Sequence, residues 1–350
     1  VEEYLKQLGI KTRRMAKTGI AGYLDVRGAK RTIALRADMD ALPMDEKTGL
    51  PFAAPAGAMH ACGHDCHTAI LLGVAKTLSR LRGELPASVR FIFQPAEELP
   101  PGGAKAMVDE GVMDSVDEVY GLHVGSRVAS GKIVAEAGAQ MANVDDVTVT
   151  IRGAGAHGAS PQQSVDPVLC ASEAILSIQQ IVSRNILPVE PAVISICMIE
   201  AGTAYNIIPE TCSFRGTIRT FSTSLRRSMP KMIRRVVAGV ARAYGAKFDM
   251  VYENGYDALV NDEEAVGYVQ QAARDLFGKN ALFFHGPRMG AEGFSEYLKV
   301  ARGCFFSLGT GDKKKKTDAS HHNPFFKVDE SVLWRGAAMF LKLAVERGAG

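Results

Sequence analysis

Two adjacent carboxylates follow an apolar stretch, and this feature restricts the fold of the chain more than any other. Residues 89–93 read Val-Arg-Phe-Ile-Phe, which is typical of a buried strand, and Glu97 and Glu98 come shortly after it. Buried neighbouring carboxylates repel each other unless a cation or a shared proton offsets their charge. One Glu can then bind a metal ion while the other transfers protons. Taken alone, such a pair is more often a solvated loop.

Other potential metal ligands also lie at the ends of predicted strands, and this shared position favours the interpretation as a metal site. In open α/β sheets, groups beyond the carboxyl ends of the strands converge on one crevice. We therefore expect scattered side chains at predicted strand ends to form one cluster. These side chains are Asp38 and Asp40 at the end of 31–40, His123 in 118–124, and His321 and His322 after the apolar run 304–308.

Length and composition favour an enzyme of two domains. A chain of 350 residues exceeds the usual size of a single domain. The formal net charge is only +3, and Lys and Arg are spread along the chain apart from the run 313–316, which we interpret as a solvated loop. A nucleic-acid partner is therefore not expected. Six unevenly spaced cysteines and the lack of a secretory leader favour a cytoplasmic protein with free thiols, and no apolar run is long enough to span a membrane.

The pattern of predicted elements changes near residue 143. Strands are predicted at 144–152, 192–199, 211–220 and 248–252, and helices at 166–186 and 224–244. This β-α-β-β-α-β order is that of a ferredoxin-like split sandwich. We therefore expect residues 143–253 to form a small α+β domain inserted into a larger one. The larger domain, residues 1–142 and 254–350, is expected to be an α/β domain with a mixed sheet flanked by helices.

The motifs together resemble the M20 metallopeptidase and aminoacylase family, specifically the amidohydrolase branch that contains hippurate hydrolases and plant auxin-conjugate hydrolases. The resemblance covers most of the chain, and the set of motifs is specific although most of them are weak alone. It implies a two-metal catalytic domain and a lid domain that commonly also forms a homodimer. The motifs are RADMDALP at 36–43, HACGHDCH at 60–67, QPAEE at 94–98, GLH at 121–123, GAH at 155–157, NIIP at 206–209 and HNP at 322–324.

The resemblance assigns the catalytic groups residue by residue. Glu97 is implied as the general base, with Asp40 supporting the catalytic centre as a neighbouring carboxylate. A thiolate with imidazole and carboxylate ligands suits zinc better than magnesium, and manganese, nickel or cobalt are alternatives. Two such ions would share the thiolate and lie about 4 Å apart. The implied ligands are Cys62, His64, Glu98, His123 and His322.

Neighbouring histidines are expected to have other roles. His67 opens an apolar helix, so a capping or supporting role is favoured over direct ligation, and His60 also only flanks the ligand pair. Asp38 stands where more distant branches of the family place a metal-binding His, and His64 is expected to fill that place. His285 is interpreted as a loop residue.

The inserted domain is expected to contribute substrate-binding groups. By the resemblance, His157 reaches the active site of a neighbouring subunit and stabilises an oxyanion, while Asn206 and Arg219 help to hold the substrate. His157 lies in the Gly-rich segment 153–161, which allows close approach to a ligand. Without the resemblance, a plain loop residue would be the better interpretation of His157.

The expected reaction is hydrolysis of the amide bond of a small N-acyl-amino acid. An N-acetyl-diaminopimelate deacetylase or a dipeptidase would use the same site, and a catalytically silent metal-dependent binding protein is a further alternative. Two departures from the family pattern bear on activity: Gly293 stands where the family has Asp, and the N-terminal helix is shorter than in relatives. The acyl group, the amino-acid side chain and the native metal do not follow from the sequence.

Overall fold

The computed structural model describes residues 1–349, which form two compact units. The first unit comprises Val1–Gln140, Leu259–Pro287 and the described residues from Glu292 onward, and the second comprises Met141–Ala258 with Arg288–Ala291. Within the described residues, no helix is both long and apolar enough to cross a membrane.

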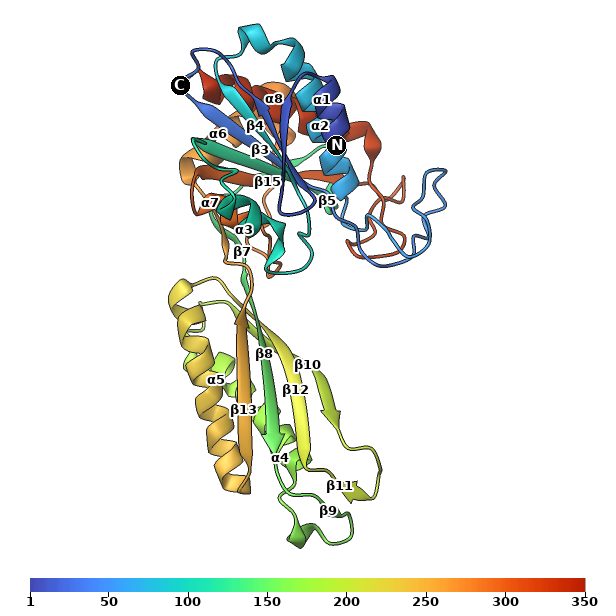
Figure 1. Cartoon of the computed structure of the whole chain (residues 1–350), viewed down its shortest axis with the longest axis vertical. Helices are drawn as coiled ribbons and strands as arrows, with labels where there is room; N and C mark the ends of the chain where they lie inside the picture. The colour runs from blue at the N-terminus through green and yellow to red at the C-terminus, as the bar shows by residue number, and fades with distance from the viewer. Residues whose placement is uncertain (350) are drawn as a thin grey trace. The chain divides into compact units, whose positions relative to one another are not determined.

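The first unit is built on a seven-stranded mixed sheet with the order β1-β2-β4-β3-β5-β15-β6 (Figure 1). Strands β4, β3, β5 and β15 run parallel to their neighbours in this series, whereas β1, β2 and β6 pair antiparallel. The parallel strands are rich in fully buried Ile, Leu, Val and Phe, as expected for strands covered on both faces. The bounds are β1 Lys11–Met15, β2 Gly19–Leu24, β3 Thr32–Asp38, β4 Ser88–Gln94, β5 Glu118–Ala129, β6 Ile133–Val134 and β15 Arg302–Gly311.

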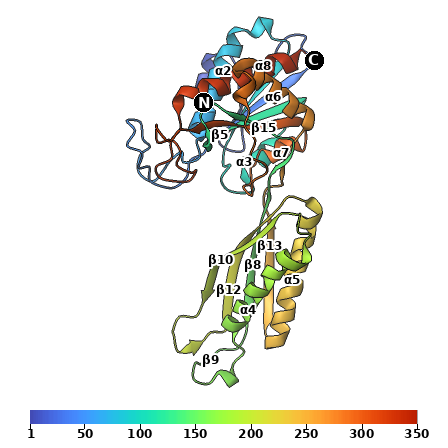
Figure 2. The ribbon, with the colours of Figure 1, turned by 180° about the vertical axis from the view of Figure 1, so that it is seen from behind.

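Helices cover both faces of this sheet (Figures 1 and 2). Helices α2, α6 and α8 pack against one another, and α3 packs with α7. A short pair of strands, β7 with β14, lies where the chain passes between the two units. The bounds are α1 Glu2–Gln7, α2 His64–Arg80, α3 Gly102–Asp109, α6 Glu263–Phe277, α7 Ser295–Leu298, α8 Leu333–Gly348, β7 Gly138–Met141 and β14 Leu259–Asn261.

The second unit has a four-stranded antiparallel sheet with the order β10-β12-β8-β13 and two helices packed on it. Side chains on β8 and β12 alternate between buried and partly exposed, because only one sheet face is covered by α4 and α5. A two-stranded ribbon, β9 with β11, extends from this sheet. The bounds are β8 Asn143–Arg152, β9 Ala156–His157, α4 Pro167–Gln180, β10 Ala192–Ala201, β11 Ile207–Ile208, β12 Thr211–Thr220, α5 Thr223–Tyr244 and β13 Lys247–Asn254.

The observed elements extend or shift several predicted ones. The order β8-α4-β10-β12-α5-β13 is the β-α-β-β-α-β order expected from the sequence. Helix α4 ends at Gln180 because a π-helical turn, Ile181–Asn185, replaces its last predicted turn. The second unit also includes Arg288–Ala291, which runs beside its first strand: the Ala142 N–H donates to the Gly290 carbonyl.

Candidate metal centre

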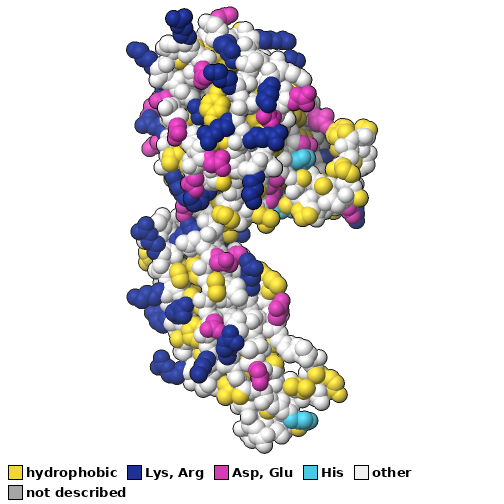
Figure 3. Space-filling view, viewed as in Figure 1, with side chains coloured by type: hydrophobic (Ala, Val, Ile, Leu, Met, Phe, Trp, Pro, Cys, Tyr) yellow, Lys and Arg dark blue, Asp and Glu magenta, His cyan; other side chains and the backbone are white. Residues whose placement is uncertain are grey.

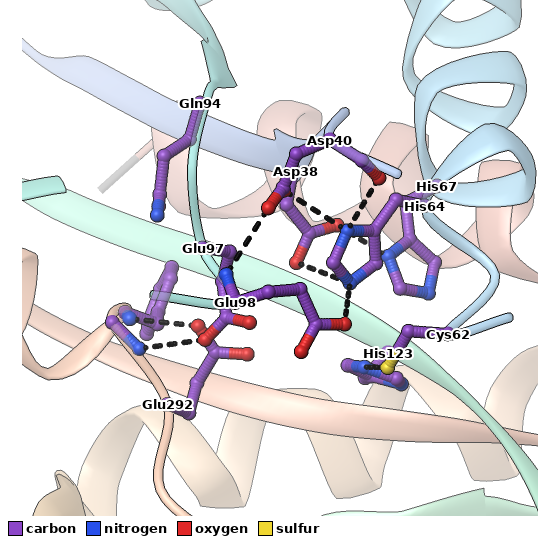
Figure 4. A network of polar contacts seen from close by, with 12 residues as sticks. Asp38, Asp40, Cys62, His64, His67, Gln94, Glu97, Glu98, His123 and Glu292 are labelled. Atoms are coloured by element: carbon purple, nitrogen blue, oxygen red, sulfur yellow. Dashed lines mark hydrogen bonds and ion pairs between the residues drawn. The ribbon is translucent and has the colours of Figure 1, made fainter. Parts of the chain in front are cut away.

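The carboxyl ends of the parallel strands bring most of the predicted site residues together. Asp38 ends β3 in register with Gln94, which ends β4, and the chain continues from Gln94 to Glu97 and Glu98. His123 lies on β5, in register with Ser307 of β15. This convergence follows the rule for open α/β sheets, and Figure 4 shows the side chains facing one another.

Gly63 allows the ligand-bearing segment before α2 to approach β5. The residue has φ +85°, a left-handed conformation that favours glycine. A Cβ atom at this position would lie 2.4 Å from Cγ2 of Val124, so any side chain would collide with β5. Cys62 and His64 therefore flank a spacer that must be glycine. Helix α2 begins at His64, three residues earlier than the predicted start at His67.

Among the described residues, four overlapping groups of donor atoms could hold a metal ion, including Asp38 with His64 and His67, and His64 with Glu97 and Glu98. The remaining two groups share the thiol of Cys62. One group consists of Cys62, His64 and His123, and the other of Cys62, Glu98 and His322, with the ligand atoms of each group within 4.8 Å of one another. Cys62 Sγ lies 3.4 Å from Nε2 of His123. The Nε2 atom of His322 lies 3.2 Å from Oε1 of Glu98. A shared thiolate between two donor groups is the arrangement expected of a ligand that bridges two ions.

Hydrogen bonds to Nδ1 leave the other ring nitrogen of two histidines free to bind. Nδ1 of His64 lies 3.1 Å from both the carbonyl and a carboxylate oxygen of Asp40, and Nδ1 of His123 lies 2.7 Å from the carbonyl of Val124. These oxygens accept hydrogen bonds from the Nδ1–H, so in the neutral ring the lone pair is on Nε2, which points into the cluster. Asp40 also accepts a bond from the backbone N–H of Glu98, and it thereby orients two of the predicted ligands.

The donor set fits a divalent cation of the zinc type. Nε2 of His64 and Oε1 of Glu98 are buried and make no hydrogen bond, and their polar neighbours lie at ion-pair distances: the two atoms are 3.8 Å apart, and Oε1 of Glu98 is 3.2 Å from Nε2 of His322. Buried polar atoms without partners are rare in proteins and often mark the place of an ion. Burial, together with the nearby charge of Glu98, raises the pKa of the Cys62 thiol, so that it would ionise at neutral pH only next to a cation.

The pKa of the His64 imidazole reflects the negative charge of the carboxylates around it. Burial disfavours the charged imidazole, but Asp38, at 3.6 Å from Nε2, and Asp40 outweigh it and raise the pKa of His64 to about 10. These carboxylates therefore favour the protonated ring when no cation is bound.

Two further histidines have ring nitrogens engaged in hydrogen bonds within the protein. His67 donates from Nδ1 to Asp38, at 2.5 Å, and accepts at Nε2 from the N–H of Val124, so both ring nitrogens are occupied. Burial lowers the pKa of His67 to about 3, in agreement with a neutral ring. His321 contacts the carbonyl of Val124 through Nε2 and packs on Phe326. These contacts fit the supporting role predicted for His67 and the preference for His322.

Glu97 has an environment unlike that of Glu98. Its side chain is 8% exposed, and one oxygen accepts the N–H of Gly293 at 3.1 Å. Burial and the neighbouring carboxylate of Glu292 raise the pKa of Glu97 well above its ordinary range. A raised pKa makes a carboxylate a stronger proton acceptor, which is a property that a general base requires.

The sequence interpretation missed the buried residues Arg36 and Glu292. Arg36 is fully buried and donates to Gln94, Asp38 and Glu292 at 2.8, 2.7 and 2.9 Å. Opposite charges and short hydrogen bonds compensate the cost of burying it. Arg36 lies inside a recognised motif, but Glu292 lies in a loop 256 positions later, where only its proximity to Gly293 could have drawn attention.

Backbone strain occurs at two residues of the site. Ala96 and His322 have φ values of +50° and +62°, which non-glycine residues adopt only at a cost of about 1 kcal/mol or more. One directly precedes Glu97 and the other is a predicted ligand. Strained backbone of this kind is common at binding sites, because the required direction of a side chain outweighs local preference.

The predicted substrate-binding residues all lie in the second unit. His157 and Asn206 are neighbours: β9 pairs His157 with Ile207, and the Gly158 N–H donates to the carbonyl of Asn206. His157 is exposed, and its Nδ1 accepts the N–H of Ala159. Arg219 lies at the other end of the main sheet, in register with Val144 at the start of β8. Within this unit, the structure therefore does not bring Arg219 together with His157.

Comparisons with known proteins agree with this geometry. A model of Peptidase family M20/M25/M40 matches residues 34–346. An N-acyl-L-amino acid amidohydrolase of Geobacillus stearothermophilus is 43% identical over 266 residues, 75% of this chain and 72% of that protein. Thermostable carboxypeptidase 1 of Saccharolobus solfataricus is 38% identical over 351 residues, with 99% and 88% covered.

The crystal structure of a relative agrees with the fold of this chain. The structure of a dinuclear metal-binding peptidase of family M20 from Bacillus subtilis matches with a TM-score of 0.84 and 33% identity, covering 99% of this chain and 90% of that one. The predicted α/β fold with a mixed sheet is therefore confirmed, and so is the predicted enzyme class. The chain belongs to peptidase family M20/M25/M40 and is a metal-dependent amide hydrolase.

Proposed function

We propose that this enzyme hydrolyses the amide bond of N-acyl-amino acids, with Glu97 as the general base. The observation that carries the proposal is the position of Glu97: a buried carboxyl group with a raised pKa lies beside two donor groups that share one thiol. Amide hydrolysis needs both a centre that activates water and a group that moves its proton.

The donor groups would hold two divalent ions, with zinc, manganese, nickel or cobalt as candidates. Cys62, His64 and His123 would bind one ion, and Cys62, Glu98 and His322 the other. Such ions lower the pKa of bound water and polarise the scissile carbonyl. Asp40 would keep His64 in the tautomer that presents Nε2, through the bond to Nδ1.

Glu97 would move one proton twice. Its carboxylate takes the proton of the attacking water and then delivers it to the departing amine nitrogen, so that the free amino acid leaves without a covalent enzyme intermediate. The Gly293 N–H fixes one carboxylate oxygen for this transfer. Gly293 contributes no side chain here, but its backbone donor is available.

The second unit would supply substrate binding and the dimer contact. Nδ1 of His157 accepts the Ala159 N–H, so the ring proton is on Nε2, where it could stabilise an oxyanion. Because Arg219 and Asn206 lie at different ends of the unit, they would hold one substrate from two different subunits, Arg219 at its carboxylate and Asn206 at its amide. Strand β10 is an open edge of its sheet, and its Met198 and Ile199 are 52% and 61% exposed. An open strand edge with exposed apolar side chains is a surface on which a second copy could pair, and Figure 3 shows hydrophobic side chains among charged ones on this unit.

The substrate class is the part of the proposal that the relatives support by name. The relative from Geobacillus stearothermophilus is an N-acyl-L-amino acid amidohydrolase. An N-acetyl-diaminopimelate deacetylase or a dipeptidase would be built from the same groups, and a silent binding protein would lack turnover altogether. The six cysteines are free thiols, which supports a reducing, cytoplasmic location.

A substrate panel tests the reaction. Protein loaded with each candidate metal is assayed on hippurate, acetylated amino acids, acetylated diaminopimelate and dipeptides, and bound metal is measured for each preparation. We expect turnover of N-acyl-amino acids in preference to dipeptides. Turnover restricted to dipeptides or to diaminopimelate would replace the proposed substrate, and full metal loading without turnover of any compound would leave only a binding function.

A subunit-mixing experiment tests the role of the second unit. His157→Ala should lower kcat by about 10²-fold without loss of metal, because the lost bond acts on the transition state. Arg219→Ala should chiefly raise KM for substrates with a free carboxylate. If His157 acts across a dimer, mixed dimers of His157→Ala and Glu97→Gln subunits should regain one intact site. No recovery despite demonstrated subunit exchange would exclude action in trans.

A further inference from the structure

We propose that Glu292 is a positioning residue for the general base, acting through the backbone of Gly293. This inference rests on the function proposed for Glu97. Glu292 is 2% exposed, lies on the loop before α7, and has no assigned role in the reaction. Figure 4 shows its carboxylate beside that of Glu97.

The contacts form a short chain from a buried cation to the base. Nη2 of Arg36 donates to Oε1 of Glu292 at 2.9 Å, and the same oxygen accepts the N–H of Phe294 at 2.8 Å. These two bonds fix the Glu292–Phe294 turn. The middle residue of that turn is Gly293, whose N–H donates to Oε1 of Glu97 at 3.1 Å. The direction of the Gly293 N–H therefore depends on the reach of the Glu292 side chain.

Arg36 makes this turn rigid. It is fully buried, its other donors are bound to Asp38 and Gln94, and its guanidinium lies 5.9 Å from the ring centres of Phe294 and Phe305. A guanidinium held by three acceptors has little freedom to move, so it provides a fixed anchor for Glu292. Gly293 has no side chain, so its backbone is the group that faces Glu97.

Position can be separated from charge by two conservative variants. Glu292→Gln keeps the length of the side chain and an oxygen that accepts the Phe294 N–H, but it removes the charge. Glu292→Asp keeps the charge but withdraws the carboxylate by one methylene. A positioning role predicts that Glu292→Asp lowers kcat by about tenfold or more, with KM and bound metal unchanged. Glu292→Gln should keep kcat within about threefold of the wild type when each enzyme is compared at its own pH optimum, because losing this charge moves the pH profile of the base without removing the Gly293 contact.

The double variants show whether Glu292 acts through the base. In a Glu97→Gln background, Glu292→Asp should lower kcat no further, because residues that act as one unit are not additive. Glu118→Gln is the matched control. Glu118 is also 2% exposed and bound to arginines. It lies at the start of β5, whereas the site residues lie at the other end of the parallel strands, so Glu118→Gln should leave kcat unchanged.

Crystal structures of the wild type and both variants provide a test that does not need activity. We expect the contact between Gly293 N and Glu97 Oε1 to be lost in Glu292→Asp and kept in Glu292→Gln. Wild-type kcat in Glu292→Asp, an intact contact in its crystal structure, or a lower kcat in Glu292→Gln than in Glu292→Asp would overturn the inference. A wild-type enzyme without amide turnover would instead contradict the proposed function, while the structures still decide the positioning.

Discussion

The first unit contains two buried networks of charge, one at each end of its parallel strands, and they differ in completeness. Glu118, at the start of β5, accepts from Arg31 at 2.7 Å, Tyr120 at 2.8 Å and Arg347 at 2.9 Å. At the other end, Arg36 is fully bonded, yet the adjacent donor cluster has atoms that make no hydrogen bond. A complete network stabilises the fold, whereas an incomplete one is suited to binding.

Glu118 and Glu97 show the same contrast in their protonation. Burial alone would raise the pKa of each carboxyl group. For Glu118, the bonds from Arg347, Tyr120 and Arg31 outweigh burial and lower its pKa. For Glu97, the nearby Glu292 adds to burial and the pKa rises. The same residue type, buried in both places, is thus a fixed charge in one place and suited to proton transfer in the other.

The largest effect is expected for the base itself. Glu97→Gln should keep metal but lose at least about 10²-fold in kcat, because the amide cannot carry the proton. Glu98→Ala should lose metal together with activity. Bound metal and kcat are measured on the same samples. If Glu97→Gln turns over at nearly the wild-type rate, the contrast between Glu97 and Glu118 has no catalytic meaning.

Two cysteines four residues apart should respond differently. Cys62 belongs to both donor groups, whereas Cys66 lies one turn along α2 and belongs to neither. Cys62→Ala should therefore reduce bound metal and activity together, and Cys66→Ala should leave both largely intact. Metal analysis of the two variants after dialysis makes this comparison. Equal losses of metal would show that the thiol ligand has been assigned wrongly.

Metal affinity should rise with pH. The pKa of His64 in the metal-free protein is raised to about 10, and that of the Cys62 thiol is also raised, so both groups hold protons at neutral pH that a metal must displace. At pH values below the pKa of the group, the apparent metal affinity should rise by about tenfold per pH unit for each proton that the metal displaces. Competition titrations with a chelator at several pH values measure the slope. A metal affinity that does not change with pH would show that His64 and Cys62 do not hold these protons in the metal-free protein.

The smallest effect on catalysis is expected at Glu118. Glu118→Gln should lower the free energy of unfolding by about 2 kcal/mol, because it leaves two partly buried arginines without their charge partner. Since the folded-state pKa of Glu118 is lowered, its contribution is present above the unfolded pKa and is lost as the pH falls. Denaturant unfolding at neutral and acidic pH tests this. A loss of kcat comparable to that of Glu97→Gln would remove the distinction between the networks.

Local sequence patterns predict the groups that lie at strand ends. The apolar runs before Asp38 and Glu97 and around His123 indicate buried parallel strands, and the geometry of such sheets brings their ends together. The β-α-β-β-α-β order of the second unit follows from periodicity in the same way. These features could be predicted because each depends on a short stretch of sequence.

The features that were missed depend on tertiary contacts. Glu292 has a role only because Arg36, 256 positions away, is buried beside it, and no local pattern indicates that pairing. The hairpin of β1 and β2 and the C-terminal helix α8 were not predicted either. The early start of α2 at His64 follows from Gly63, whose unusual backbone is decided by packing against Val124.

The spacer between the first two ligands also has an evolutionary consequence. The chain can change its donor atoms at positions 62 and 64 without moving α2, because those side chains point into the cluster. It cannot change position 63, where any side chain would collide with Val124. The metal preference of this scaffold can therefore diverge by substitution of two side chains, while the frame that presents them is inherited unchanged.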